Sequence, residues 1–177
     1  MKGTKTAARY ATALLEFSVE KNVLSEVYRD MVYLHDLVLE NYDFQLFLKN
    51  PIINSTKKKD VFSSVFSDFN EVSIQFIHLM TQNKRENILL AISESFISQY
   101  KTKNGIFPVT ITSAHKLDDK VRKDILDKIK KEINGEIELT EQIDASIIGG
   151  FVVRMGDKRI DASVASQFSN LKQHLTR

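Results

Sequence analysis

The histidines are the first residues whose side chains could serve acid–base or metal chemistry. They are His35, His78, His115 and His174, each in a different predicted element. A metal site needs several ligands that converge on one ion, and no two of these histidines stand at ligand spacing. The chain has no cysteine, which excludes disulfides, thiolate metal ligands and cysteine nucleophiles. We therefore expect neither a metal nor a cofactor.

Three aspartates in the C-terminal part are the second candidate for chemistry. Asp144, Asp157 and Asp161 could supply an acid–base pair or hold Mg²⁺. A structural interpretation is favoured, because Asp157 follows Gly156 in a predicted tight turn. Asp161 stands where a helix needs an N-cap. A Mg²⁺-dependent enzyme that uses the three carboxylates is the alternative.

Glycines and lysines form two further patterns with chemical meaning in other proteins. Gly149-Gly150 and Gly156 are separated by an apolar strand, and no Gly-Lys-Ser/Thr follows, so a phosphate loop is not indicated. We interpret these glycines as residues that shape a bulge or a close backbone approach. The run 57–59 is three lysines in the first turn of a predicted helix. We interpret it as a solvated face, and an acidic partner is the alternative.

Charge and composition narrow the class of protein. The 177 residues are 42% hydrophobic and 27% charged, and the net charge is only +2. These values are typical of an ordinary globular protein. A helical RNA-binding module is an alternative function, but it would need a clustered basic face. Basic and acidic residues are nearly balanced on both sides of Gly105, so neither half is a basic domain.

Up to about residue 103 the apolar residues recur at helical spacing. We predict N-caps at Asp43, Ser55 and Asn70, where a polar residue precedes an apolar stripe. The connections are short, which predicts a compact six-helix bundle. The predicted helices cover residues 7–18, 23–38, 44–49, 55–66, 70–80 and 88–100.

After Asn104-Gly105 the period changes from 3.6 to 2. Strands are predicted over 107–111, 137–143 and 147–155, and a helix over 121–133. A turn at 155–158 predicts a hairpin whose second strand passes through Ile160. A last helix begins near 161–163. The fold class is therefore α+β, with a helical domain at 1–105 and a small β-α-β-β-β-α domain at 106–177.

Two of the predicted helices carry apolar stripes that are wider than one core face requires. One stripe lies in the first helix and the other in the fifth. Extra core burial is the common cause of such a stripe, and a second helix laid against the surface is the other. The wide stripes include Tyr10, Leu14, Phe17, Phe76, Leu79 and Met80.

Residues 145–175 contain a combined signature. It consists of Gly149-Gly150, an apolar strand, Gly156-Asp157, the helix start Asp161-x-Ser163, and a helix with Phe168, Leu171 and Leu175. This pattern strongly resembles the delta subunit family of F-type ATP synthases, whose mitochondrial relative is the oligomycin-sensitivity-conferring protein. Phe168 departs mildly from the family pattern, which usually has Leu there. Residues 8–11, Asn83 and Arg85 also resemble the family, so the resemblance covers nearly the whole chain.

The resemblance implies a non-catalytic subunit of the peripheral stalk in a proton-translocating ATP synthase. In the family, the helical domain grips the N-terminal helix of an alpha subunit between its first and fifth helices. The wide stripes named above are the faces in question. The family also implies that domain 106–177 holds the C-terminal end of the b subunits. Gly149, Gly150, Gly156, Asp157, Asp161 and Ser163 then form the structural motif of that domain.

The membrane relationship is expected to be indirect. The longest uncharged apolar stretch covers residues 147–153, far short of the roughly 20 residues of a spanning helix. The first nine residues contain no apolar segment typical of a secretory signal. Together with the resemblance, this predicts a peripheral protein on the cytoplasmic face of a bacterial inner membrane.

Overall fold

The computed structural model describes residues 2–115, 118–132, 135–156 and 158–164, together with residues 166 and 168. The chain forms two compact units, residues 1–100 and residues 101–177. The sequence-based division lies at residue 105. Several residues used in the predictions lie outside the described part, namely Asp157, Ile133, Leu171 and Leu175.

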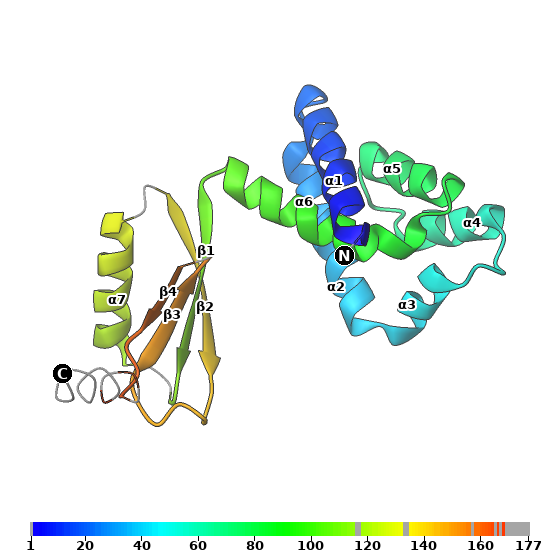
Figure 1. Cartoon of the computed structure of the whole chain (residues 1–177). Helices are drawn as coiled ribbons and strands as arrows, with labels where there is room; N and C mark the ends of the chain where they lie inside the picture. Colours follow the sequence, from blue (N-terminus) through cyan, green and yellow to red (C-terminus); the bar gives the residue numbers. More distant parts are fainter. Residues whose placement is uncertain are drawn as a thin grey trace. The chain divides into compact units, whose positions relative to one another are not determined.

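The first unit is helical (Figure 1). Short connections join its helices, and a single 3-10 turn, η1, leads directly into α6. The last turn of α6 extends past Tyr100 into the second unit. The elements are α1 (Lys2–Glu20), α2 (Leu24–Glu40), α3 (Tyr42–Lys49), α4 (Ser55–Val65), α5 (Glu71–Gln82), η1 (Glu86–Ile88) and α6 (Leu89–Lys103). None of the described helices is long and apolar enough to cross a membrane.

One apolar core holds the helices of the first unit together, and every α-helix contributes to it. An aromatic cluster from α3, α4 and the following turn lies at one end, with neighbouring ring centroids 4.5 to 6.3 Å apart. Edge-to-face and offset ring pairs add about 0.5–1.5 kcal/mol beyond the area that they bury. The cluster therefore fixes α3 against α4. It consists of Phe44, Phe47, Phe62, Phe66 and Phe69.

Asparagines form the N-caps of three helices in this unit. The side chain of Asn70 accepts a hydrogen bond from Val72 N, which confirms the cap predicted for α5. The predicted caps Asp43 and Ser55 are wrong, because both residues already lie inside their helices. Asn41 and Asn54 cap α3 and α4 instead. Each is an extended residue that offers its side-chain oxygen to a free N–H of the first turn.

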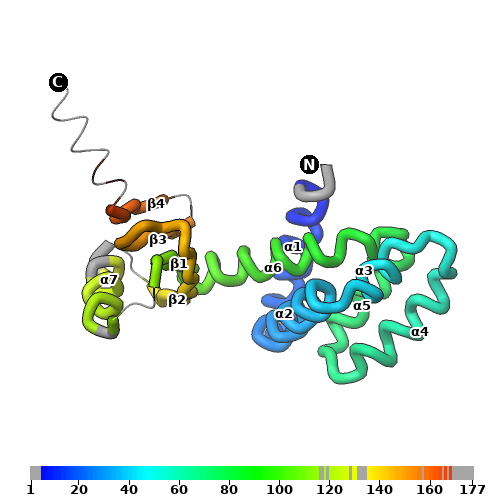
Figure 2. Tube along the Cα trace, turned by 90° about the horizontal axis from the view of Figure 1, so that it is seen from below, coloured from blue at the N-terminus to red at the C-terminus, as the bar shows by residue number. Residues whose placement is uncertain are grey.

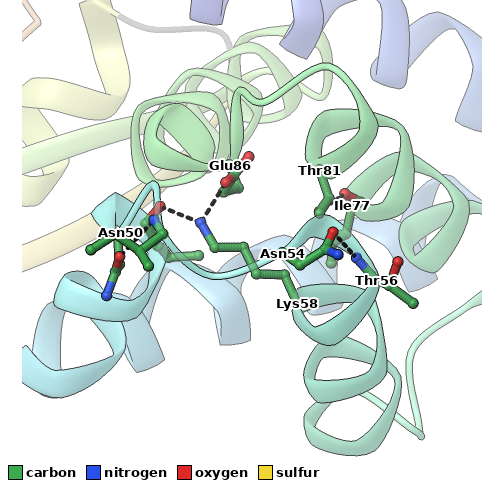
Figure 3. A network of polar contacts seen from close by, with 9 residues as sticks. Asn50, Asn54, Thr56, Lys58, Ile77, Thr81 and Glu86 are labelled. Atoms are coloured by element: carbon green, nitrogen blue, oxygen red, sulfur yellow. Dashed lines mark hydrogen bonds and ion pairs between the residues drawn. The ribbon is translucent and has the colours of Figure 1, made fainter.

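The lysine run at the start of α4 is only in part the solvated face that the sequence indicates. Lys57 is exposed, but the side chain of Lys58 is only 1% exposed. Its Nζ lies 2.5 Å from Glu86 Oε1 and 3.3 Å from the carbonyl oxygen of Leu48 (Figure 3). The ammonium also lies 5.9 Å from the centroid of the Phe47 ring. Successive side chains of a helix point to different faces, so the middle lysine of the run, Lys58, points inward although its neighbours are also charged.

The second unit is a four-stranded mixed sheet with a helix on one face. Its elements are β1 (Ile106–Ser113), α7 (Asp119–Glu132), β2 (Glu136–Ile143), β3 (Phe151–Met155) and β4 (Lys158–Asp161). The strand order is β2-β1-β3-β4, with β1 parallel to β2 and the other pairs antiparallel. Figure 2 shows α7 alongside the strands. The predicted hairpin is confirmed by the pairing of Met155 with Lys158.

Alternation along the strands separates a core face from an open face. Val109, Ile111 and Val153 are buried and pack against Ile125 and Ile129 of α7. The intervening side chains lie on the other face of the sheet, because successive strand residues alternate. A mixed helix-and-sheet fold is therefore confirmed.

The buried ion pair gives the first testable prediction. Replacing Lys58 by Ala should lower the free energy of unfolding by about 3–5 kcal/mol, because Glu86 is left as a buried charge without a counter-ion. Lys57→Ala is the matched control and should stay within about 0.5 kcal/mol of wild type. Urea unfolding followed by circular dichroism measures both.

A double variant separates the pair from the packing around it. Lys58→Met with Glu86→Leu should recover most of the stability, since apolar residues of similar volume often replace a buried ion pair without loss. Equal stability of Lys58→Ala and Lys57→Ala would contradict the structural role of Lys58.

Candidate functional site

The first candidate surface lies where α1 meets α5. The rings of Tyr10 and Phe76 pack edge to face, with centroids 6.5 Å apart and planes at 68°. Leu14 and Met80 belong to the same buried cluster. Ala7 and Ala11 of α1 are both fully buried in the core of the unit. The α1 and α5 faces are therefore fixed relative to each other by core packing.

The six residues predicted to form a partner surface divide into two groups. Leu14, Phe76 and Met80 are buried, so the structure corrects their expected place on an accessible face. The reason is that the wide stripes first supply the core of the unit itself. Phe17 is 40% exposed and Leu79 47% exposed, while Tyr10 is partly buried at the border.

Sequence reasoning placed Arg85 only as a family position and missed its contact with this surface. Its guanidinium donates a hydrogen bond to the Tyr10 hydroxyl and lies 5.5 Å from the centroid of that ring. The backbone explains how it arrives there. Arg85 N bonds the carbonyl of Met80, Lys84 N bonds that of Thr81, and Lys84 has a φ of 53°. This is a Schellman turn at the end of α5.

The second candidate region is the glycine motif of the sheet unit. Gly150 has a φ of 82°, and a Cβ built on it would lie 2.4 Å from the carbonyl oxygen of Ala162. The two segments are tied by hydrogen bonds of 3.0 Å from Ala162 N to Phe151 O and from Val164 N to Gly149 O. Gly150 thus permits a close backbone approach, one of the two alternatives that the sequence predicts. Gly156 also has a positive φ, 56°, in the β3–β4 turn.

Two of the three candidate aspartates act as turn-forming residues. Asp144 Oδ1 accepts a hydrogen bond from Ser146 N, and Asp161 Oδ1 accepts one from Ser163 N. The bonds from Ser146 lower the pKa of Asp144, and those from Ser163, with a smaller effect of Arg159, lower the pKa of Asp161. Both carboxylates are therefore ionised at neutral pH.

The predicted N-cap role of Asp161 needs correction, because Asp161 is the last residue of β4. Ser163 takes the capping position. Its Oγ accepts a hydrogen bond of 3.3 Å from Ser166 N, and Val164, Ser166 and Phe168 are helical. Asp161 instead holds the turn that delivers Ser163 to the helix start.

A cleft of about 510 Å³ occupies the open face of the sheet. It carries both aspartates, and Arg159 Nη2 pairs with Asp161 Oδ2 at 3.1 Å. No group of three potential metal ligands forms within the described ranges. The lining includes Thr110, Thr112, Gln142, Ile148, Val152 and Arg154.

Comparison with known proteins defines the class of fold first. The structure is similar to a chain in the mitochondrial ATP synthase hexamer of Toxoplasma gondii, with a TM-score of 0.75. The likeness covers 97% of both chains at 24% sequence identity, so it concerns the fold.

The family is shown by sequence. The profile described as "ATP synthase delta (OSCP) subunit" matches residues 6–175, and the chain belongs to this family. A relative named ATP synthase subunit delta, from Flavobacterium psychrophilum, is 35% identical over 99% of both chains. The relative of the same name from Christiangramia forsetii is 33% identical over 99% of this chain and 95% of its own length.

The close approach at Gly150 gives the second prediction. Gly150→Ala should destabilise the sheet unit strongly, because the new Cβ would clash with a backbone oxygen as well as adopt a left-handed φ. Gly156→Ala is the matched control, since it shares the positive φ, but no atom of the described residues beyond its chain neighbours lies within 4 Å of the new Cβ. The control should lose only about 1–2 kcal/mol. Thermal unfolding of the two variants tests the difference, and equal losses would contradict it.

The lowered pKa of Asp161 gives the third prediction. A carboxylate whose pKa is lower in the folded state adds stability above its unfolded pKa, near 3.8, and loses it as the pH falls through the folded value. Wild type should therefore exceed Asp161→Asn in stability at pH 7, and the gap should close below about pH 3.8. Urea unfolding at several pH values measures it.

Salt identifies the cause of that pH dependence. The hydrogen bonds from Ser163 are the largest cause of the lowered pKa of Asp161, and the charge of Arg159 is a smaller one. In 1 M NaCl the Debye length is roughly 3 Å, which weakens charge pairing between exposed groups. Most of the stability difference should therefore remain in 1 M NaCl. Complete loss of the effect in salt would assign it to charge pairing instead.

Proposed function

We propose that this chain is the peripheral-stalk subunit of a proton-translocating F-type ATP synthase, and that it links the catalytic head to the membrane sector. Membership of the delta (OSCP) family over residues 6–175 is the observation that carries the proposal. The subunit is non-catalytic, so its chemistry is the binding of other proteins. It must hold the head against the torque of the rotor, which requires slow dissociation from its partners.

The helical unit, acting as one six-helix bundle over residues 1–105, would bind the N-terminal helix of an alpha subunit. Phe17 and Leu79 support this role, because they are large apolar side chains that the core leaves exposed. An amphipathic helix that covers them would remove this apolar area from water. Burying a Phe or Leu side chain contributes about 1.5–3 kcal/mol. Leu14, Phe76 and Met80 would support the surface from beneath.

The sheet unit, residues 106–177, would hold the C-terminal end of the b subunits. The cleft on its open face supports this assignment, since a bound chain would find polar groups and apolar contacts there together. Ile148, 84% exposed, stands at the border of the cleft. Gly150, Asp161 and Ser163 would act as structural residues that shape the loop carrying it.

The location follows from the complex. A stalk subunit joined to the alpha and b subunits would lie on the cytoplasmic face of a bacterial inner membrane and be held there through its partners. The bacterial relatives support a bacterial setting. The comparisons give no support to an RNA-binding module.

Binding to the alpha subunit gives the fourth prediction. The full chain should bind a peptide that copies the N-terminal helix of the alpha subunit from the same synthase, with one-to-one stoichiometry and a negative heat-capacity change. Phe17→Asp and Leu79→Asp should each weaken the affinity about tenfold or more, because each places a charge against the apolar face of the peptide. Isothermal titration calorimetry at several temperatures measures this.

The control is Leu39→Asp on α2, an equally exposed leucine outside the proposed surface. It should bind as wild type does. Absence of binding by the folded wild-type chain would contradict the proposed mechanism. Wild-type affinity in Phe17→Asp and Leu79→Asp would show that the peptide binds elsewhere, and equal loss in all three variants would show an effect of the added charge that is not specific to the proposed surface.

A further inference from the structure

Arg85 is an exposed cation that follows the end of α5 and contacts Tyr10 of α1. The Schellman turn after α5 sets its backbone, with Arg85 N bonded to Met80 O at 2.9 Å. The Tyr10 hydroxyl and ring then hold the guanidinium. Tyr10 itself packs on the buried Phe76, so the Tyr10 ring connects the guanidinium of Arg85 to the core. Little side-chain entropy remains to be lost when a ligand binds such an arginine.

The charge of Arg85 is not balanced inside the unit. In the part of the chain that the structure describes, no carboxylate lies within ion-pair distance of its guanidinium. The neighbouring Glu86 turns inward to Lys58 and is committed to the buried pair. Lys84, on the other side, adds a second positive charge. An exposed, oriented and unpaired guanidinium next to an apolar face favours a ligand that brings both a carboxylate and apolar side chains.

We propose that Arg85 is a specificity-determining residue that selects a partner helix by a carboxylate at one end of the helix's apolar stripe. This inference rests on the proposed function, because it assigns the chemistry of the alpha-subunit helix at that same surface. Phe17 and Leu79 bind the apolar stripe without reading its direction or register. Arg85 supplies that information, because only one placement of the helix brings its carboxylate to the guanidinium.

Other occupants fit this arrangement less well. The segment 164–177 of the chain contains no Asp or Glu, so it brings no carboxylate side chain to Arg85. A nucleic acid would bring phosphates to Arg85, but nucleic-acid-binding proteins present a clustered basic face. The proposed surface presents the apolar side chains of Phe17 and Leu79 instead. A second copy of the chain would be detected as a change in oligomeric state.

Charge reversal on both partners tests the proposal. The alpha-subunit peptide is made with each of its acidic residues changed to Lys in turn, and each is titrated into full-length wild type and Arg85→Glu. Arg85→Glu should weaken the parent peptide about tenfold, because a like charge then faces the carboxylate. One of the Lys peptides should bind Arg85→Glu more tightly than it binds wild type.

Arg9→Glu is the matched control, since Arg9 is an exposed arginine adjacent to Tyr10 but on another face of α1. It changes the net charge equally and should weaken binding by less than about threefold. Arg85→Lys keeps the positive charge but lacks the planar guanidinium, so its affinity for the peptide should lie between those of Arg85→Glu and Arg9→Glu. Circular dichroism and urea unfolding establish that every variant is folded.

The outcomes separate this inference from the proposed function. Failure of wild type to bind the parent peptide removes the proposed function. Normal binding with Arg85→Glu no weaker than Arg9→Glu removes the role of Arg85 and leaves the apolar contact intact. Weakening of every peptide by Arg85→Glu, with no rescue by any Lys peptide, would show long-range charge effects and overturns the specific pairing.

Discussion

A single buried lysine joins three segments of the helical unit that are distant in sequence. Lys58 of α4 contacts Glu86 of η1 and the carbonyl of Leu48 at the end of α3. Glu86 Oε2 is buried and has no hydrogen-bond partner among the described residues. The carboxylate of Glu86 therefore depends on Lys58 for its stabilisation. In the chain, η1 lies between the end of α5 and the start of α6. The arrangement of the helices around the aromatic cluster therefore depends on this contact.

The proposed binding role uses residues that remain after the core has been filled. On α1, Ala7, Ala11 and Leu14 are buried in the core, and Phe17 remains exposed at the surface. On α5, Phe76 and Met80 are interior and Leu79 is left over. A helix that is apolar over more than one face thus serves two purposes at once. The buried residues fix the positions of the two helices, and the exposed Phe17 and Leu79 remain available to contact a partner.

Much of the fold could be predicted from the sequence because its local signals agree. The change from helical to alternating spacing near Gly105 separates the helices from the sheet, and the turn at 155–158 predicts the hairpin. Two helix starts were predicted too far along the chain, since Asn41 competes with Asp43, and Asn54 with Ser55, for the same cap. The strand order is not encoded locally. It arises because β1 pairs on both sides with later strands.

The candidate site was harder to predict than the fold. Periodicity shows that Leu14, Phe17, Phe76 and Leu79 are apolar, but it does not say which the core will take. Lys58 could not be distinguished from its neighbours, because its burial depends on η1, which lies far along the chain. The contact of Arg85 with Tyr10 likewise joins residues 75 positions apart. Such pairs become visible only in three dimensions.

The position of β1 at the centre of the sheet has a consequence for synthesis on the ribosome. This strand emerges first, yet its parallel partner follows only at Glu136, and its antiparallel partner only at Phe151. One edge of β1 therefore stays open until β2 has been made, and the other until β3 has been made. Open strand edges are templates for pairing with other chains. Pro108, which has no N–H to donate, lies in the half of β1 that β3 leaves uncovered, where it discourages such pairing. Vulnerability to aggregation during translation is thus concentrated in the sheet unit, after the helical unit has already emerged.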